Sequence, residues 1–196
     1  MRCGAFLVCG SLLGFAGCMT SPPPVRSWTI EPNGPVAAAA VEGRAPAFPT
    51  TRLGTVVVDA PFDRPAMAVR RADGTLAFDA RNEFAAAPAA LLRAPVKAQL
   101  SADGRFGHVV GNTSLAGTDA AVETTVTDLS LDCREAGRRT ARVAVNLDVI
   151  KTGRGPRRVE LSGSGTGTAD AAAGDYGEAF STAFDAAFKD ALKSLK

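Results

Sequence analysis

Alternation of apolar and polar positions is clearest in the second half of the chain and predicts three consecutive strands. The middle strand is the most regular, because Val143, Val145, Leu147 and Val149 alternate with polar neighbours. Residues 122–133 precede it, and their apolar positions change parity between Val126 and Leu129, which predicts a β-bulge. Residues 159–168 form the third strand of this predicted meander.

Glycine and hydroxyl residues alternate at the end of that third strand, in the run from Gly163 to Thr168. Glycines inside a strand favour close backbone approach or a bend. A helix is then predicted over residues 174–195, since Phe180, Phe184 and Phe188 recur every fourth residue. We interpret this phenylalanine stripe as core rather than as a ligand-binding surface.

Shorter patterns precede the meander. Strands are predicted over 55–59, 66–70 and 76–79, the last two joined by a turn with an Asp-Gly pair at 73–74. An alanine-rich helix follows over 87–102, with a kink or break at Pro95, and a strand over 105–111. The expected fold is α+β, a small antiparallel or mixed sheet with two helices packed on one face.

The N-terminal segment predicts no continuous element, because prolines interrupt it from residue 22 to residue 49. Residues 18–52 are expected to form a tether and residues 53–196 the folded domain. Trp28 is the only tryptophan. We expect it to dock on the domain or on a neighbouring subunit, so that the tether is partly ordered, and it is our candidate partner contact.

Residues 1–17 have the features of a bacterial lipoprotein leader. Arg2 precedes an apolar stretch over 5–15, and the run from Gly14 to Cys18 reads Gly-Phe-Ala-Gly-Cys. The stretch is shorter than the roughly 20 residues that a membrane-spanning helix needs. We predict cleavage before Cys18 and acylation of its sulfur; the alternative is an ordinary secretory leader followed by a fortuitous cysteine. Met19 is not the aspartate that retains lipoproteins in the inner membrane, so we expect the periplasmic side of the outer membrane, with the inner membrane as the alternative.

Composition and candidate chemistry favour binding over catalysis. The formal charge of +2 gives no footprint for nucleic acid. With Cys3 and Cys9 in the leader and Cys18 acylated, Cys133 is the one remaining thiol, which we expect to be a small buried strand residue. His108 is the only histidine and is expected to be a strand residue with a satisfied ring. We predict no metal, no cofactor and no enzymatic activity.

Several segments together resemble the ABC-type transport auxiliary lipoproteins, the PqiC-like family. Residues 27–32, Ser-Trp-Thr-Ile-Glu-Pro, resemble that family's Tyr-Tyr-Thr-Leu-like segment after the lipidated cysteine. Residues 56–59 and 61–65 resemble its first strand and Asp-Arg-Pro turn, and residues 77–84 the segment before its helix. Trp28 stands in place of tyrosine and Phe84 where tryptophan is commoner.

This resemblance implies a fold similar to the amino-terminal domain of TolB and assembly into a homo-oligomeric ring. The implied partners are a mammalian-cell-entry (MCE) domain protein and its ABC transporter, which move lipids between the membranes. A second hypothesis is a structural envelope lipoprotein that activates or supports a cell-wall synthesis assembly. A third is an enzyme that uses Cys133 or Ser164 as a nucleophile.

Overall fold

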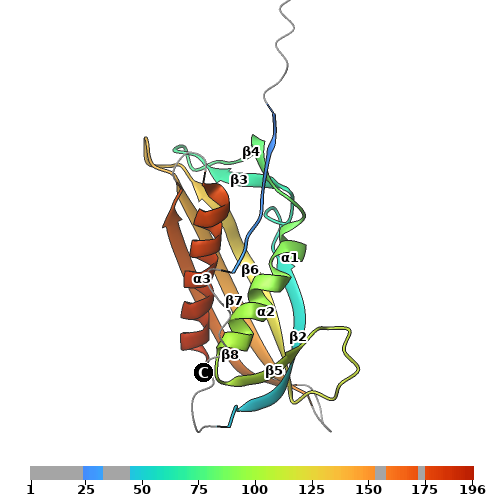
Figure 1. The fold of residues 1–196 in the computed structure, drawn as a ribbon. Helices are drawn as coiled ribbons and strands as arrows, with labels where there is room; N and C mark the ends of the chain where they lie inside the picture. The colour runs from blue at the N-terminus through green and yellow to red at the C-terminus, as the bar shows by residue number, and fades with distance from the viewer. Residues whose placement is uncertain (1–23, 33–44, 153–157, 172–174) are drawn as a thin grey trace, which may run out of the picture.

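The structure, a computed structural model, describes residues 24–32, 45–152, 158–171 and 175–196. Its elements, in chain order, are β1 (Arg26–Trp28), β2 (Phe48–Val58), β3 (Ala66–Arg70), β4 (Leu76–Phe84), α1 (Pro88–Leu91), α2 (Arg93–Ala102), β5 (Phe106–Val110), β6 (Ala120–Asp132), β7 (Thr140–Lys151), β8 (Arg158–Asp170) and α3 (Tyr176–Ser194). All the strands belong to one mixed sheet, and α2 and α3 lie on the same face of it (Figure 1). The predicted α+β class and the placement of two helices on one face are confirmed.

The meander forms as the alternation predicts, and β6 is the centre of the sheet. One edge of β6 pairs with β7 in antiparallel fashion along its whole length, and β7 pairs with β8. The other edge of β6 pairs with two parallel strands in turn, first β2 as far as Val126 and then β3 from Ser130. The change of partner coincides with a register shift between Val126 and Asp128, which is the predicted bulge.

Helix α3 packs very close to β8 because the glycines of β8 face it. A Cβ atom added at Gly165 would lie 2.1 Å from the Ala187 carbonyl oxygen, and one at Gly167 would lie 1.9 Å from that of Ala183. Only a residue without a side chain allows this approach. The predicted role of these glycines in packing is confirmed.

The core lies between the sheet and the helices. The side chains of Phe180, Phe184 and Phe188 are fully buried, as the stripe predicts, and Phe84 of β4 contacts the Phe180 ring edge-on at 5.2 Å between centroids. Helices α2 and α3 are joined by Gln99, whose Nε2 donates a hydrogen bond of 2.6 Å to Oδ1 of the buried Asp185.

Two predictions about the elements need correction. The predicted helix over 87–102 is interrupted at Leu92 and not at Pro95, because Pro95 lies in the first turn of α2, where its missing N–H costs no helical hydrogen bond. The sheet also begins upstream of the predicted domain start at residue 53. Residues 48–52 already belong to β2, and residues 26–28 form β1, a parallel neighbour of β4.

Candidate interaction surfaces

The predicted lipidation residue, Cys18, lies outside the described residues, and so does the whole leader. The chain enters the described structure at Pro24, only two residues before β1. Within the described ranges, no helix is both long and apolar enough to cross a bilayer. The nearest described element to Cys18 is therefore the strand that contains Trp28.

Trp28 docks on the domain, as predicted. Its indole Nε1 donates a hydrogen bond of 3.1 Å to Oδ1 of Asn82, and its ring lies 5.7 Å from that of Tyr176 between centroids. The Asn82 amide is oriented in turn, because its Nδ2 donates to Asp79 Oδ2 at 3.0 Å. We call Trp28, Asn82 and Tyr176 the N-terminal clasp.

Tyr176 is the member of the clasp that sequence reasoning missed. It is buried at the start of α3, and its hydroxyl accepts a hydrogen bond from Arg139 Nη1. A signal for it exists, since Tyr176 stands four residues before Phe180 and extends the phenylalanine stripe by one turn. Asn82 has no comparable signal, because its role depends on a strand pairing that joins residues 54 positions apart.

The open face of the sheet carries a row of paired charges near the β6–β7 turn. Past the bulge, Leu129 and Leu131 point into the core, so Asp128, Ser130 and Asp132 lie on the opposite face. We call the following residues the ion-pair ladder: Arg70, Asp128, Arg142, Asp132 and Arg134.

Each carboxylate of the ladder has two cationic neighbours. Asp128 Oδ2 lies 3.0 Å from Arg70 Nη2 and 3.8 Å from Arg142 Nε. Asp132 Oδ2 lies 2.6 Å from Arg134 Nη2 and 3.6 Å from Arg142 Nη1. The carboxylates are mostly covered and the guanidiniums are about a third to a half exposed, so the ladder presents cations to solvent.

The end of the ladder borders a hollow of about 360 Å³, lined by Asp132, Arg134, Glu135, Arg138, Thr140 and Arg142. Its lining carries charges of both signs, from two carboxylates and three guanidiniums. Such a surface can hold polar or ionic groups of a partner.

The acid stability of the protein is expected to depend on Asp132. Hydrogen bonds from the Arg134 side chain lower the pKa of Asp132 to about 2 from the ordinary 3.8, helped by the Arg134 backbone N–H and the charges of Arg134 and Arg142, against a smaller effect of burial. The resulting stabilisation is complete above the unfolded-state pKa and is lost as the pH falls through the folded-state pKa. Asp132→Asn should therefore remove about 1 kcal/mol at pH 6 and almost nothing at pH 2, since solvent screens part of the interaction.

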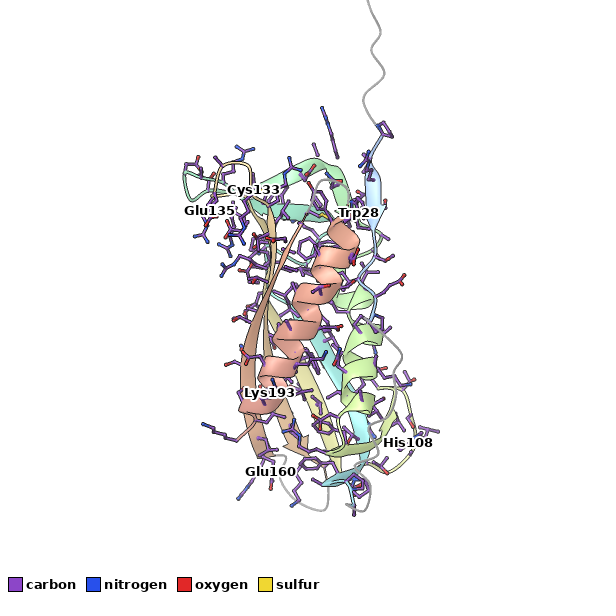
Figure 2. The ribbon with its side chains drawn as sticks, turned by 60° about the vertical axis from the view of Figure 1, so that its left-hand side comes forward. Trp28, His108, Cys133, Glu135, Glu160 and Lys193 are labelled. Carbon is purple, nitrogen blue, oxygen red and sulfur yellow. The ribbon has the colours of Figure 1, made fainter. Side chains whose placement is uncertain are left out.

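Urea unfolding at pH 6 and pH 2 measures this difference. Glu160→Gln is the matched control, because Glu160 is an exposed carboxylate in β8 at the other end of the molecule (Figure 2). Equal losses for Asp132→Asn at the two pH values would contradict the prediction.

The structure does not bring the candidate nucleophiles together. Cys133 follows β6 instead of lying within a strand, and it is half-buried, which corrects the predicted buried strand position. Burial raises the pKa of its thiol, so the reactive thiolate is scarce at neutral pH. Ser164 is exposed in β8, and His108 is exposed in β5 toward the opposite end of the molecule from Cys133 (Figure 2). The described residues contain no group of three or more potential metal ligands.

The free edge of β8 is covered at Ser162 and Ser164. Ser194 Oγ accepts a hydrogen bond of 2.9 Å from the Ser164 N–H and donates one of 2.8 Å to the Ser164 carbonyl. The backbone of Lys196 exchanges two hydrogen bonds with Ser162. These contacts occupy groups that an exposed edge strand would offer to another chain.

Comparisons with known proteins show the fold alone. No protein-family model matches the chain, and the search of curated proteins found no match. A crystal structure of protein XCC0632 from Xanthomonas campestris, of the family DUF330, superposes with a TM-score of 0.57 at 16% identity, covering 87% of this chain and 92% of that one. A crystal structure described as an uncharacterized protein superposes with a TM-score of 0.56 at 14% identity, covering 87% of this chain and 97% of that one.

Proposed function

We propose that this protein is a lipid-anchored accessory of an MCE-type ABC lipid transport system, held at the periplasmic side of the outer membrane, and that it acts by binding and scaffolding. The observation that carries the proposal is Cys18 at the end of a lipoprotein-like leader, six residues before the first described residue of a small domain. Acylation of that cysteine would be the defining chemistry of the protein.

The partner rests on the resemblance to the ABC-type transport auxiliary lipoproteins. The relevant segments are the Trp28 strand, the Asp-Arg-Pro turn at 63–65 and the strand that leads to Phe84. These three segments meet at one end of the domain: Trp28 and Phe84 are register partners, and the Phe84 N–H donates a hydrogen bond to the Pro65 carbonyl. The same resemblance supports a relation to the amino-terminal domain of TolB, assembly into a ring, and an MCE-domain protein with its ABC transporter as partners.

A binding role is also compatible with the surface chemistry. The exposed charges of the ladder are paired. Burial raises the pKa of the Cys133 thiol, and the hydroxyl residues of β8 line an open sheet face. Paired, partly exposed charges set the orientation and specificity of a protein contact more than its affinity.

The anchor is tested by expressing the full chain and its Cys18→Ala variant and following incorporation of labelled palmitate and membrane fractionation. We expect the native chain to be labelled and to sediment with outer membranes, and the variant to be unlabelled. Label retained by the variant would refute the anchor. Recovery in the inner membrane alone would refute the outer-membrane location.

The partner is tested by affinity purification of the membrane-extracted protein. We expect co-purification of an MCE-domain protein with its permease and ATPase. Recovery of a cell-wall synthase in their place would favour the structural envelope role instead.

A further inference from the structure

The chain between Cys18 and the domain is short. Six residue steps separate Cys18 from Pro24, the first described residue, and an extended chain advances at most about 3.6 Å per step, or roughly 20 Å in all. This distance is much less than the predicted tether of 18–52 would allow. If Cys18 is acylated as proposed, the end of the domain where Pro24 and β1 lie must therefore stay near the membrane anchor.

Residues 26–31 are held to the domain from two sides. On one side, β1 pairs in register with residues 82–84 of β4, and Ser27 Oγ donates to Glu83 Oε1 at 3.2 Å. On the other side, the Ile30 side chain is only 3% exposed, and the Glu31 N–H donates to Ser181 Oγ of α3 at 3.0 Å. Together with the N-terminal clasp, these contacts prevent the segment from acting as a free linker.

The end of the molecule from which β1 begins also carries the β3–β4 turn and the β6–β7 turn (Figure 1). Trp28, Cys133 and Glu135 lie toward this end, whereas His108, Glu160 and Lys193 lie toward the other (Figure 2). We call the exposed residues 71–75 and 134–139, with Val25 and Arg26, the proximal surface.

The side chains of the proximal surface suit phospholipid headgroups. It exposes more guanidiniums than carboxylates, and guanidiniums can donate hydrogen bonds to headgroup phosphates. The guanidiniums are those of Arg26, Arg71, Arg134, Arg138 and Arg139, and the carboxylates are those of Asp73 and Glu135. Arg134 is also paired with Asp132, and Arg139 with the Tyr176 hydroxyl. The ion pairs of Arg138 are long, at 3.3 and 3.4 Å, and their carboxylates are 75% exposed or more, so phosphate can replace them at little cost. Val25, 54% exposed, adds an apolar side chain next to the entry point.

We propose that β1 is a strap that holds the proximal surface against the headgroup layer of the bilayer, so that the domain has a fixed orientation on the membrane. The opposite end, with β5, the loop over 111–119 and the C-terminal end of α3, then points into the periplasm. The ladder shares Arg134 with the proximal surface, so it would stand next to the bilayer as well.

The orientation is measured by energy transfer from single fluorescent labels to an acceptor on lipid headgroups. The full-length chain, with its leader, carries Cys133→Ser and either Ala136→Cys in the β6–β7 turn or Leu115→Cys in the loop over 111–119. Both positions are exposed, Leu115 completely. The purified lipoprotein is placed in vesicles of phosphatidylethanolamine and phosphatidylglycerol. We expect several-fold more energy transfer from position 136 than from position 115.

A length variant gives the control. Inserting about 20 Gly/Ser residues between Thr20 and Ser21 adds a coil of roughly 25 Å without changing any described contact. We expect the difference between the two labels to shrink strongly. Trp28→Ala, which opens the N-terminal clasp, should shrink it too. Thr29→Ala is the matched control and should leave the difference unchanged, because the exposed Thr29 hydroxyl bonds Glu31 of the same segment.

The outcomes separate the strap from the anchor. A protein that does not float with vesicles overturns the proposed acylation and the strap with it. A protein that floats but gives equal transfer from positions 136 and 115, or more from 115, overturns the strap alone. Floating with transfer concentrated at position 136 supports both.

Discussion

Gly167→Ala is expected to lower the free energy of unfolding by about 3 kcal/mol. The new Cβ would lie 1.9 Å from the Ala183 carbonyl oxygen and 2.6 Å from the Ala187 nitrogen, both of them backbone atoms of α3. Backbone cannot rotate away as a long side chain can, so the helix has to move back from β8. That movement loosens the contact of the phenylalanine stripe with the sheet.

Urea unfolding followed by circular dichroism measures the effect, with Thr168→Ala as control. Thr168 is the next residue of β8, but it is exposed and lies on the face without the helix. We expect the control to lose less than about 1 kcal/mol, the span of strand propensities. Equal midpoints for the two variants would show that α3 does not depend on the glycines.

Phe184→Ala is expected to cost about 4 kcal/mol, because it removes a fully buried ring from the centre of α3. The substitution also removes the contact between the rings of Phe184 and Phe188, whose centroids lie 5.5 Å apart. The surrounding core is formed by helix and sheet together, so it can collapse into the cavity only partly. A loss of this size lowers the melting temperature by roughly 10 °C in a domain of this length.

Lys189→Ala, on the exposed side of the same helix, separates burial from helix propensity. Alanine is the better helix former, so the control should melt at the native temperature or slightly above it. Thermal unfolding by circular dichroism compares the two variants. A Phe184→Ala variant that melts with the control would mean that the stripe is not the core.

The elements that could be predicted from the sequence are those in which buried and exposed side chains alternate with the period of a strand or a helix. Val143 to Val149 alternate because one face of β7 is buried, and the parity change after Val126 marks the bulge because a bulge shifts one face to the other. The stripe of Phe180, Phe184 and Phe188 predicts the buried side of α3 for the same reason.

The elements that it missed depend on partners far away in the chain. Strand β1 has three residues, which are too few to show a periodic pattern. It forms because it pairs with β4 and because Trp28 packs against Tyr176. The first residues of β2 follow a proline-rich segment, yet Phe48 stacks on Phe106 of β5 at 5.8 Å between centroids. The predicted break at Pro95 was wrong because a proline is unfavourable inside a helix but is tolerated in its first turn, where Pro95 lies.

The candidate interaction surfaces also include one feature that could be predicted from the sequence and one that could not. Trp28 was predictable as a docking residue, because a lone tryptophan in a proline-rich arm is costly to expose. The ladder was not, since Arg70 and Asp128 are 58 positions apart and meet only through the pairing of β3 with β6. Sequence reasoning located the contact of the arm but not the charged surface beside it.

The bulge in β6 separates the pairing of that strand with β2 from its pairing with β3. Among the described residues, β3 joins the group of β1, β3 and β4 to β6 through a short stretch of pairing, namely Ala68–Ser130, Val69–Leu131 and Arg70–Asp132, whereas β2 pairs with β6 over residues 120–126. Hydrogen exchange should therefore reveal a smaller cooperative unit, formed by β1, β3 and β4, that opens before global unfolding. The domain would then respond to disturbance at its N-terminal strand while the meander and α3 stay folded.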